Sequence, residues 1–183
     1  MSMLDELLSS QNANVLKQLA GTFGVSEGEV RSAVSSVLPA LSRGISHEIS
    51  DPSRVSGLVA ALRQGNHQQY LEQPDMLERN EAVQDGNAIL EHLLGSKDVS
   101  RRVAGHAADQ SGLDAGILKK MLPLIAAMAM GSLSKQAANQ GASEASSGGQ
   151  DQASMLGQLV SFLDADKDGS VMDDLLGMAR KFF

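Results

Sequence analysis

The residues of this chain whose types and spacing could do chemistry gather late in the sequence, where five carboxylates fall within residues 164–174. Three of these aspartates alternate with other residues, and a glycine follows the third. An EF-hand loop takes calcium ligands from positions 1, 3, 5, 7, 9 and 12, with glycine at position 6 for the turn. The spacing therefore predicts a calcium site with these ligands: Asp164, Asp166, Asp168, Ser170, Asp173 and Asp174.

The second half of this segment departs from the EF-hand pattern. Met172 stands at position 9 and Leu175 at position 12, so the bidentate glutamate of an EF-hand is missing. Asp173 and Asp174 remain to close the site, or water fills the gap. A site without its bidentate ligand is expected to be weak, with a dissociation constant from about a micromolar to a millimolar.

A metal-free interpretation of the same residues stays open. Asp-Gly is a turn signal, Ser170 and Asp173 have the spacing of a capping box, and acidic residues stabilise a helix N-terminus. A helix cap therefore explains the second half of the segment. It does not explain the three preceding aspartates, which repel one another unless a cation neutralises them.

No other motif indicates catalysis, so we expect a non-enzymatic protein. The chain has no cysteine, which excludes thiolate ligands and a cysteine nucleophile. Neither HExxH, GxSxG nor a phosphate-binding GxxxxGK(S/T) occurs. The four histidines fall on different predicted elements, without ligand spacing: His47, His67, His92 and His106.

Composition predicts one helical protein of the cytoplasm. The 183 residues are 42% hydrophobic and 3% aromatic, with a net charge of −7. This acidic balance argues against broad binding to nucleic acid or anionic membranes. The first residues carry acids and no basic n-region, so no signal peptide is expected. The longest apolar run, 121–133, contains Pro123 and is too short to span a bilayer.

Nearly the whole chain has helical periodicity. Ser26 and Glu29 form a capping box for a helix whose apolar stripe begins at Val30. The helix over 114–138 is apolar nearly all round, which predicts the buried centre of the fold. Pro39 and Pro123 should kink these two helices. Other helices are expected over 2–9, 14–23, 52–65, 88–94 and 99–109, and an irregular segment over 66–87 is expected to be held to the core by Tyr70, Leu71, Met76 and Leu77.

An internal repeat relates residues 20–30 to residues 108–118. Both copies read Ala-x-x-x-Gly-(Val/Leu)-(Ser/Asp)-x-Gly-x-(Val/Leu), and each leads into a helix with Leu-Pro. We expect two similar helix–turn–helix units packed as a pseudo-symmetric pair. The first copy also resembles a DNA-binding helix-turn-helix, but Glu27 and Glu29 would repel phosphate. A structural helix pair is the preferred interpretation.

The sequence thus predicts an all-α fold, a multihelical bundle with two kinked helices and a tethered C-terminal helix–loop–helix. The expected divisions are a helical domain over 1–138, a flexible Gly/Ser linker over 139–153 and a helix–loop–helix over 154–183. The last part is too small to fold alone, so it must dock on its own domain or on a partner.

Six segments, spread over most of the chain, together match a known pattern. They are Phe-Gly-Val-Ser-Glu-Gly-Glu-Val (23–30), Val-Leu-Pro-Ala-Leu (37–41), Ala-Ile-Leu-Glu-His-Leu-Leu-Gly (88–95), Ser-Gly-Leu-Asp (111–114), Lys-Lys-Met-Leu-Pro (119–123) and Asp-Gly-Ser-Val-Met-Asp-Asp-Leu-Leu-Gly (168–177). In these segments the sequence resembles the YidB-like family of bacterial proteins of unknown function. The resemblance implies an all-α fold and a bacterial source, and it brings no activity, substrate or catalytic residue.

Two functional hypotheses follow. In the first, calcium binds the 164–174 loop and sets the angle between the two helices that flank it. In the second, the chain is an interaction or assembly module that works without metal and binds a protein partner. Its docking face would then consist of Leu175, Met178, Phe182 and Phe183.

Overall fold

The computed structural model describes residues 2–51, 53–54, 57–58, 61 and 65–144. Helices account for most of these residues, and no strand occurs among them, so the predicted all-α fold class is confirmed. The helices are α1 (Met3–Leu7), α2 (Ala13–Phe23), α3 (Glu27–Ser50), α5 (Gln69–Glu72), α6 (Asn80–Leu94), α7 (Lys97–Ser111) and α8 (Ala115–Glu144), with 3₁₀ turns at Ser10–Asn12 and Pro74–Glu78.

Local capping interactions fix where several helices begin. The Ser26 hydroxyl accepts a hydrogen bond from the Glu29 backbone N–H at 3.2 Å, and the Glu29 carboxylate accepts one from the Ser26 N–H at 2.7 Å. This is the predicted capping box of α3, and Ser2 with Asp5 forms a second one at α1. Each bond satisfies a backbone group that has no partner inside the helix.

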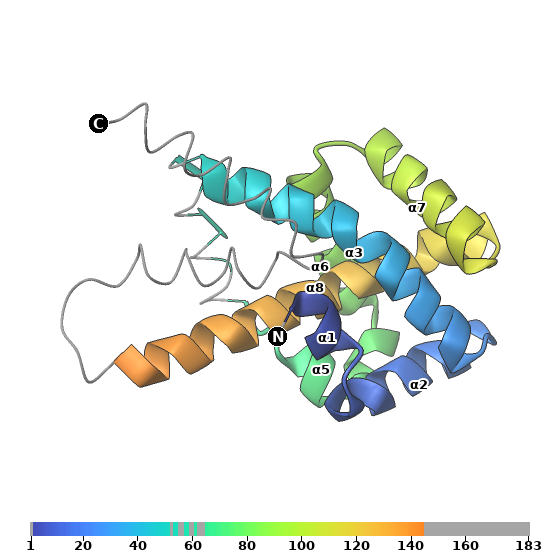
Figure 1. Cartoon of the computed structure of the whole chain (residues 1–183), viewed down its shortest axis with the longest axis horizontal. Coiled ribbons are helices and arrows are strands. Elements are labelled where there is room, and N and C mark those ends of the chain that lie inside the picture. Colours follow the sequence, from blue (N-terminus) through green and yellow to red (C-terminus); the bar gives the residue numbers. More distant parts are fainter. Residues whose placement is uncertain (1, 52, 55–56, 59–60, 62–64, 145–183) are drawn as a thin grey trace.

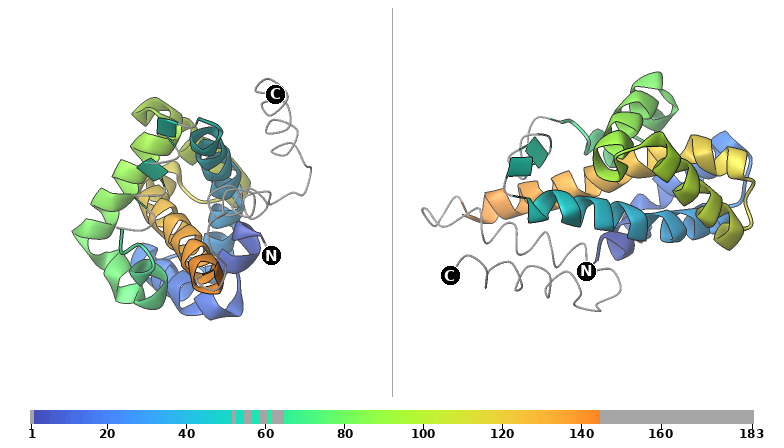
Figure 2. Two further views of the ribbon diagram at one scale, coloured as in Figure 1. Left: turned by 90° about the vertical axis from the view of Figure 1, so that its left-hand side faces the viewer. Right: turned by 90° about the horizontal axis from the view of Figure 1, so that it is seen from above.

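Helix α8 is the centre of the described fold (Figure 1). Every residue from Met121 to Ser134 is buried, around the full circumference of the helix. Seen end-on, α8 lies among α3, α6 and α1 (Figure 2, left). The prediction of a central helix is therefore confirmed, and burial of its Leu, Ile and Met side chains supplies much of the hydrophobic stabilisation.

Helix α3 crosses over α8, and the C-terminal ends of both helices extend to the same side of the molecule (Figures 1 and 2). The predicted apolar stripe of α3 faces the core. Its buried members are Val30, Ala33, Val34, Val37, Leu38, Leu41, Ile45 and Ile49.

Two glycines let the backbone of α6 come into direct contact with α8 and α3. A Cβ atom on Gly86 of α6 would clash with the carbonyl oxygen of Pro123 in α8. A Cβ atom on Gly44 of α3 would lie 2.7 Å from the carbonyl oxygen of Leu93 in α6. Because neither position can hold a side chain, α6 is clamped between α3 and α8 by backbone contacts.

Pro39 and Pro123 both lie inside continuous helices, α3 and α8. The kinks expected at these residues stay a prediction. The two copies of the repeat share their local structure. Gly24 and Gly112 each end a helix with positive φ, and Ser26 and Asp114 then accept backbone N–H bonds at the start of α3 and α8. Their packing as a pseudo-symmetric pair also stays a prediction.

The sequence prediction was wrong about the start of α6. Residues 66–87 were expected to be irregular, but α6 begins at Asn80 and the segment before it contains α5 and a 3₁₀ turn. The buried face of the early part of α6 consists of Ala82 and Gly86, which give little hydrophobic signal. The expected contacts of this segment with the core are confirmed, since Tyr70, Leu71 and Leu77 are buried and Met76 packs against the core.

Candidate functional site

The predicted calcium ligands lie outside the described residues, as does the expected helix–loop–helix over 154–183. Within the part of the chain that the structure describes, no group of three or more His, Asp or Glu side chains could hold a metal ion. The calcium prediction thus rests on the sequence of these residues: Asp164, Asp166, Asp168, Ser170, Asp173 and Asp174.

One polar cluster in the described body surrounds the carboxylate of Glu48, near the end of α3. The side chain of Glu48 is 4% exposed. Arg54 donates from Nη1 to Glu48 Oε1 at 3.0 Å, and His92 Nε2 of α6 lies 3.6 Å from Glu48 Oε2. A buried carboxylate is costly unless it is paired. These contacts therefore join α3, the residues that follow it and α6.

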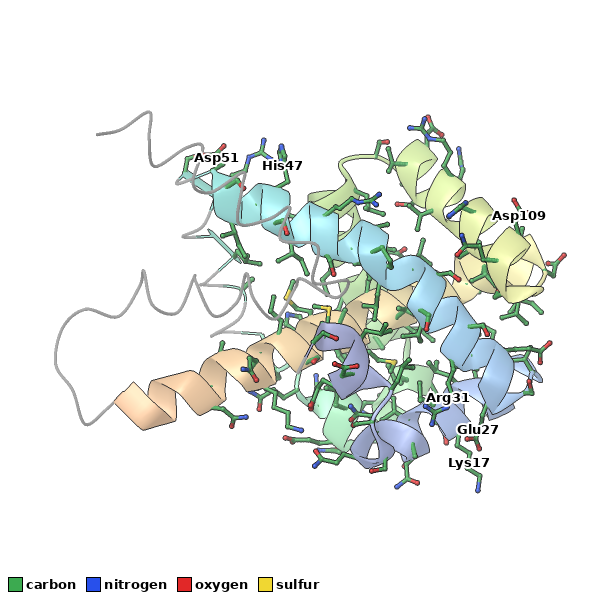
Figure 3. All side chains as sticks on the ribbon, viewed as in Figure 1. Lys17, Glu27, Arg31, His47, Asp51 and Asp109 are labelled. Atoms are coloured by element: carbon green, nitrogen blue, oxygen red, sulfur yellow. The ribbon has the colours of Figure 1, made fainter. Side chains whose placement is uncertain are left out.

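Asp51 extends this cluster toward solvent. Its carboxylate accepts hydrogen bonds from the hydroxyl and the N–H of Ser53, and Arg54 Nε lies 3.3 Å from Asp51 Oδ2. The Ser53 bonds, with the positive charge of Arg54 beside them, lower the pKa of Asp51. His47 lies next to Asp51 at the same end of α3 (Figure 3). The lowered pKa favours the ionised form of Asp51, whose carboxylate shares Arg54 with Glu48.

A second polar cluster lies where α5 packs against α6. Tyr70 of α5 is 1% exposed, and its hydroxyl donates a hydrogen bond to Oδ2 of Asp85 in α6. Burial and the neighbouring carboxylate both raise the pKa of Tyr70. The phenol therefore keeps its proton at neutral pH, so it is not available as a base or a nucleophile.

His67 completes the second cluster. Its ring centroid lies 6.3 Å from that of Tyr70. Its Nδ1 atom is buried and has no hydrogen-bond partner among the described residues. Burial lowers the pKa of His67, and the negative charge of Asp85 opposes this shift in part. The imidazole is therefore held mainly in its neutral form.

Sequence reasoning missed both clusters, although one signal was present. Glu48 falls seven residues after Leu41 and between Ile45 and Ile49, so it lies on the apolar stripe of α3. A charged residue on a buried stripe indicates a buried ion pair. No comparable signal marks Asp85 or His67, because the contacts of α5 with α6 and α8 depend on tertiary packing.

In chemical terms, both clusters join helices. Glu48 is paired with Arg54, and Asp85 accepts the bond from Tyr70. In the second cluster the Tyr70 hydroxyl lies beside a carboxylate, and this bond connects α5 to α6. The other described histidine contact, between His106 and Gln110, is on the exposed surface of α7.

The sequence profile of a family described as bacterial proteins of unknown function, DUF937, matches residues 5–136. The chain belongs to this family. The match supports the resemblance to YidB-like proteins over the helical body of this DUF937 protein, and it does not reach residues 164–174. A search of the curated proteins and a search of the solved structures found no match.

Among the described residues of this DUF937 protein, one helix has the length and composition of a membrane span. It is Ala115–Asn139, within α8, with a mean hydropathy of 1.4. In its most apolar window, however, 78% of the residues are buried inside the protein. The core helix of a folded domain has this burial, because every face of it contacts other helices.

Proposed function

We propose that the protein is a non-enzymatic helical module of the bacterial cytoplasm that binds calcium through residues 164–174. The observation that carries this proposal is the alternation of Asp164, Asp166 and Asp168 before Gly169. Calcium prefers clustered carboxylate and carbonyl oxygens, and this spacing supplies them from one short loop. Calcium would order the loop and fix the angle between its flanking segments.

The described body supports a scaffolding role beside this loop. Its buried charged and phenolic groups, Glu48 and Tyr70, are engaged in contacts between helices. The matched family region ends at residue 136, before the acidic loop begins. The cysteine-free composition is compatible with a reducing compartment. The helical body and the calcium loop are therefore separable in sequence.

Calorimetric titration of calcium into the metal-free full chain tests this proposal, with magnesium as the competing ion. We expect a calcium-selective binding heat with a dissociation constant from about a micromolar to a millimolar, the range of sites that lack full ligation. The variant Asp164→Asn/Asp166→Asn removes two ligands and should abolish this heat.

The matched control removes the same charge elsewhere. Asp98→Asn/Asp109→Asn changes two exposed aspartates of α7 and should bind calcium like the unmodified chain. No calcium heat in the unmodified chain would overturn the proposal, and the aspartates would then be a helix cap. Equal loss in both double variants would show that the effect comes from net charge and not from ligation.

A second candidate function is that of a metal-independent interaction module that uses its last helical segment. It is favoured by the surface of the described body, on which Val83 is the only exposed large apolar side chain. Leu175→Asp/Phe182→Asp in the full chain should then change the oligomeric state or the set of bound proteins, with and without calcium. Unchanged sedimentation and unchanged partners would argue against this function.

A further inference from the structure

The segment 65–73, which contains α5, is seated on α8 by its backbone. A Cβ atom on Gly131 of α8 would lie 2.5 Å from the carbonyl oxygen of His67 and 3.4 Å from Leu71 Cγ. This close contact between the backbone of the segment and α8 is possible because residue 131 is a glycine. Small movements of His67 are therefore not absorbed locally, and the segment is either seated on α8 or displaced from it.

The imidazole of His67 shares this seat. Its Nδ1 atom is enclosed and has no partner, and its Nε2 atom lies against the backbone of Gly65. A neutral imidazole can leave Nδ1 as an unprotonated acceptor. Protonation turns Nδ1 into an N–H donor with no acceptor, in a ring that also gains a charge. Both changes oppose the seated arrangement.

The groups around His67 provide little compensation for such a charge. From α6, Asp85 attracts it, but one oxygen of this carboxylate already accepts the Tyr70 hydroxyl. On α5 itself, Tyr70 stays neutral. On α8, the contact is Gly131, and the charged residue one turn further on, Lys135, is paired with Glu6 of α1 at 3.2 Å.

We propose that His67 is an acid-sensitive latch whose protonation releases segment 65–73 from α8 and exposes Tyr70 and Leu71. Both side chains are buried in the seated state. Their exposure in acid would give the described part of the protein a new apolar surface, where Val83 is the only exposed large apolar side chain in the seated state. The rest of α8 stays held by α3, α6 and α7, so the change is confined to one side of the core.

The sign of the pH effect follows from the direction of the shift. Burial lowers the pKa of His67 below its ordinary value of 6.5. Neutral His67 stabilises the seated state fully at pH values above 6.5. The stabilisation is lost as pH falls through the lowered pKa of the seated state. Release is therefore an effect of mild acid.

Hydrogen exchange of the full chain tests the latch, after correction for intrinsic rates. Amides of residues 67–73 should exchange about fivefold faster at pH 5.5 than at pH 7.5, the factor expected at the low end of the cost of a buried donor without an acceptor. Amides of α7 should show no such change, because α7 lies away from α5 (Figure 1).

Two histidine variants separate the latch from general effects of acid. His67→Gln cannot be protonated and should make the exchange of residues 67–73 independent of pH. His106→Gln removes an exposed histidine of α7 and should keep the pH response of the unmodified chain. A pH response that survives in His67→Gln would overturn the proposal, and so would its absence in the unmodified chain.

A measurement on the unmodified chain keeps the test decisive if His67→Gln does not fold. The ring carbon resonances of His67 should titrate at a pH below 6.5, the ordinary value for histidine. The amides of residues 67–73 should shift with the same midpoint as the ring. A His67 ring that titrates at or above 6.5, or amide shifts that do not follow the midpoint of the ring, would show that there is no latch.

Discussion

Gly86 brings the backbone of α6 against the carbonyl group of Pro123 in α8, at a separation that excludes a Cβ atom. The sequence shows Gly86 as one small residue among the polar residues of that segment. Its role is visible only when two helices far apart in the chain are placed together. The same holds for Gly44 beside Leu93 and for Gly131 beside His67.

Substitution of Gly86 by alanine should destabilise the fold. The added methyl group meets the Pro123 backbone, which belongs to a buried helix and cannot move aside without shifting α6. We expect Gly86→Ala to lower the free energy of unfolding by about 3 kcal/mol, near the upper end for overpacking. Chemical denaturation measured by circular dichroism at 222 nm would show the change.

The control is Gly21→Ala in α2, where nothing lies within 4 Å of the added Cβ atom. That change should raise the free energy of unfolding by about 0.5 kcal/mol, since alanine restricts the unfolded chain more than glycine does. Equal effects of the two substitutions would contradict the close contact between α6 and α8.

At the scale of single elements, the predictable helix boundaries are those with local signals. Ser26 and Glu29 predicted the start of α3, and the glycines after α2 and α7 predicted the ends of those two helices. The start of α6 was missed because Arg79, at its N-cap, makes no side-chain capping bond. Without a cap or a strong apolar stripe, tertiary contacts decide where a helix begins.

Removal of the cap of α3 should weaken the fold in a pH-dependent way. Ser26→Ala loses the bonds of its hydroxyl with Glu29 and should cost about 1 kcal/mol at neutral pH. The Ser26 hydrogen bonds lower the pKa of Glu29 below its ordinary value of 4.5. The contribution of these hydrogen bonds to the free energy of unfolding is present above pH 4.5 and is lost as pH falls through the lowered pKa of Glu29.

Thermal unfolding of both proteins between pH 3 and pH 7 measures this difference. The gap between the unmodified chain and Ser26→Ala should narrow toward the acid end of the range. Ser36→Ala serves as control, because the Ser36 hydroxyl bonds only to the Ser32 carbonyl within α3 and has no part in the cap. A gap that does not change with pH would show that the bond from the Ser26 hydroxyl to the Glu29 carboxylate does not contribute to the cap.

At the scale of the whole molecule, the all-α class and the central position of α8 could be predicted, because both follow from the period of apolar residues. The order in which helices pack around α8 could not. The polar clusters were missed for the same reason, since Tyr70 meets Asp85 and Glu48 meets His92 only through that packing. The calcium prediction needed only local spacing, and its residues lie beyond the described fold.

The place of α8 in the chain has a consequence for how the protein is made. The helix that buries the faces of α1, α3, α5 and α6 is the last of the described elements to leave the ribosome. Until residues 121–134 emerge, α3 can pack against α2, α6 and α7, but the core that these helices share with α8 is incomplete. Apolar side chains of the earlier helices therefore stay exposed until α8 has been synthesised. During this interval the nascent chain can aggregate unless chaperones bind it.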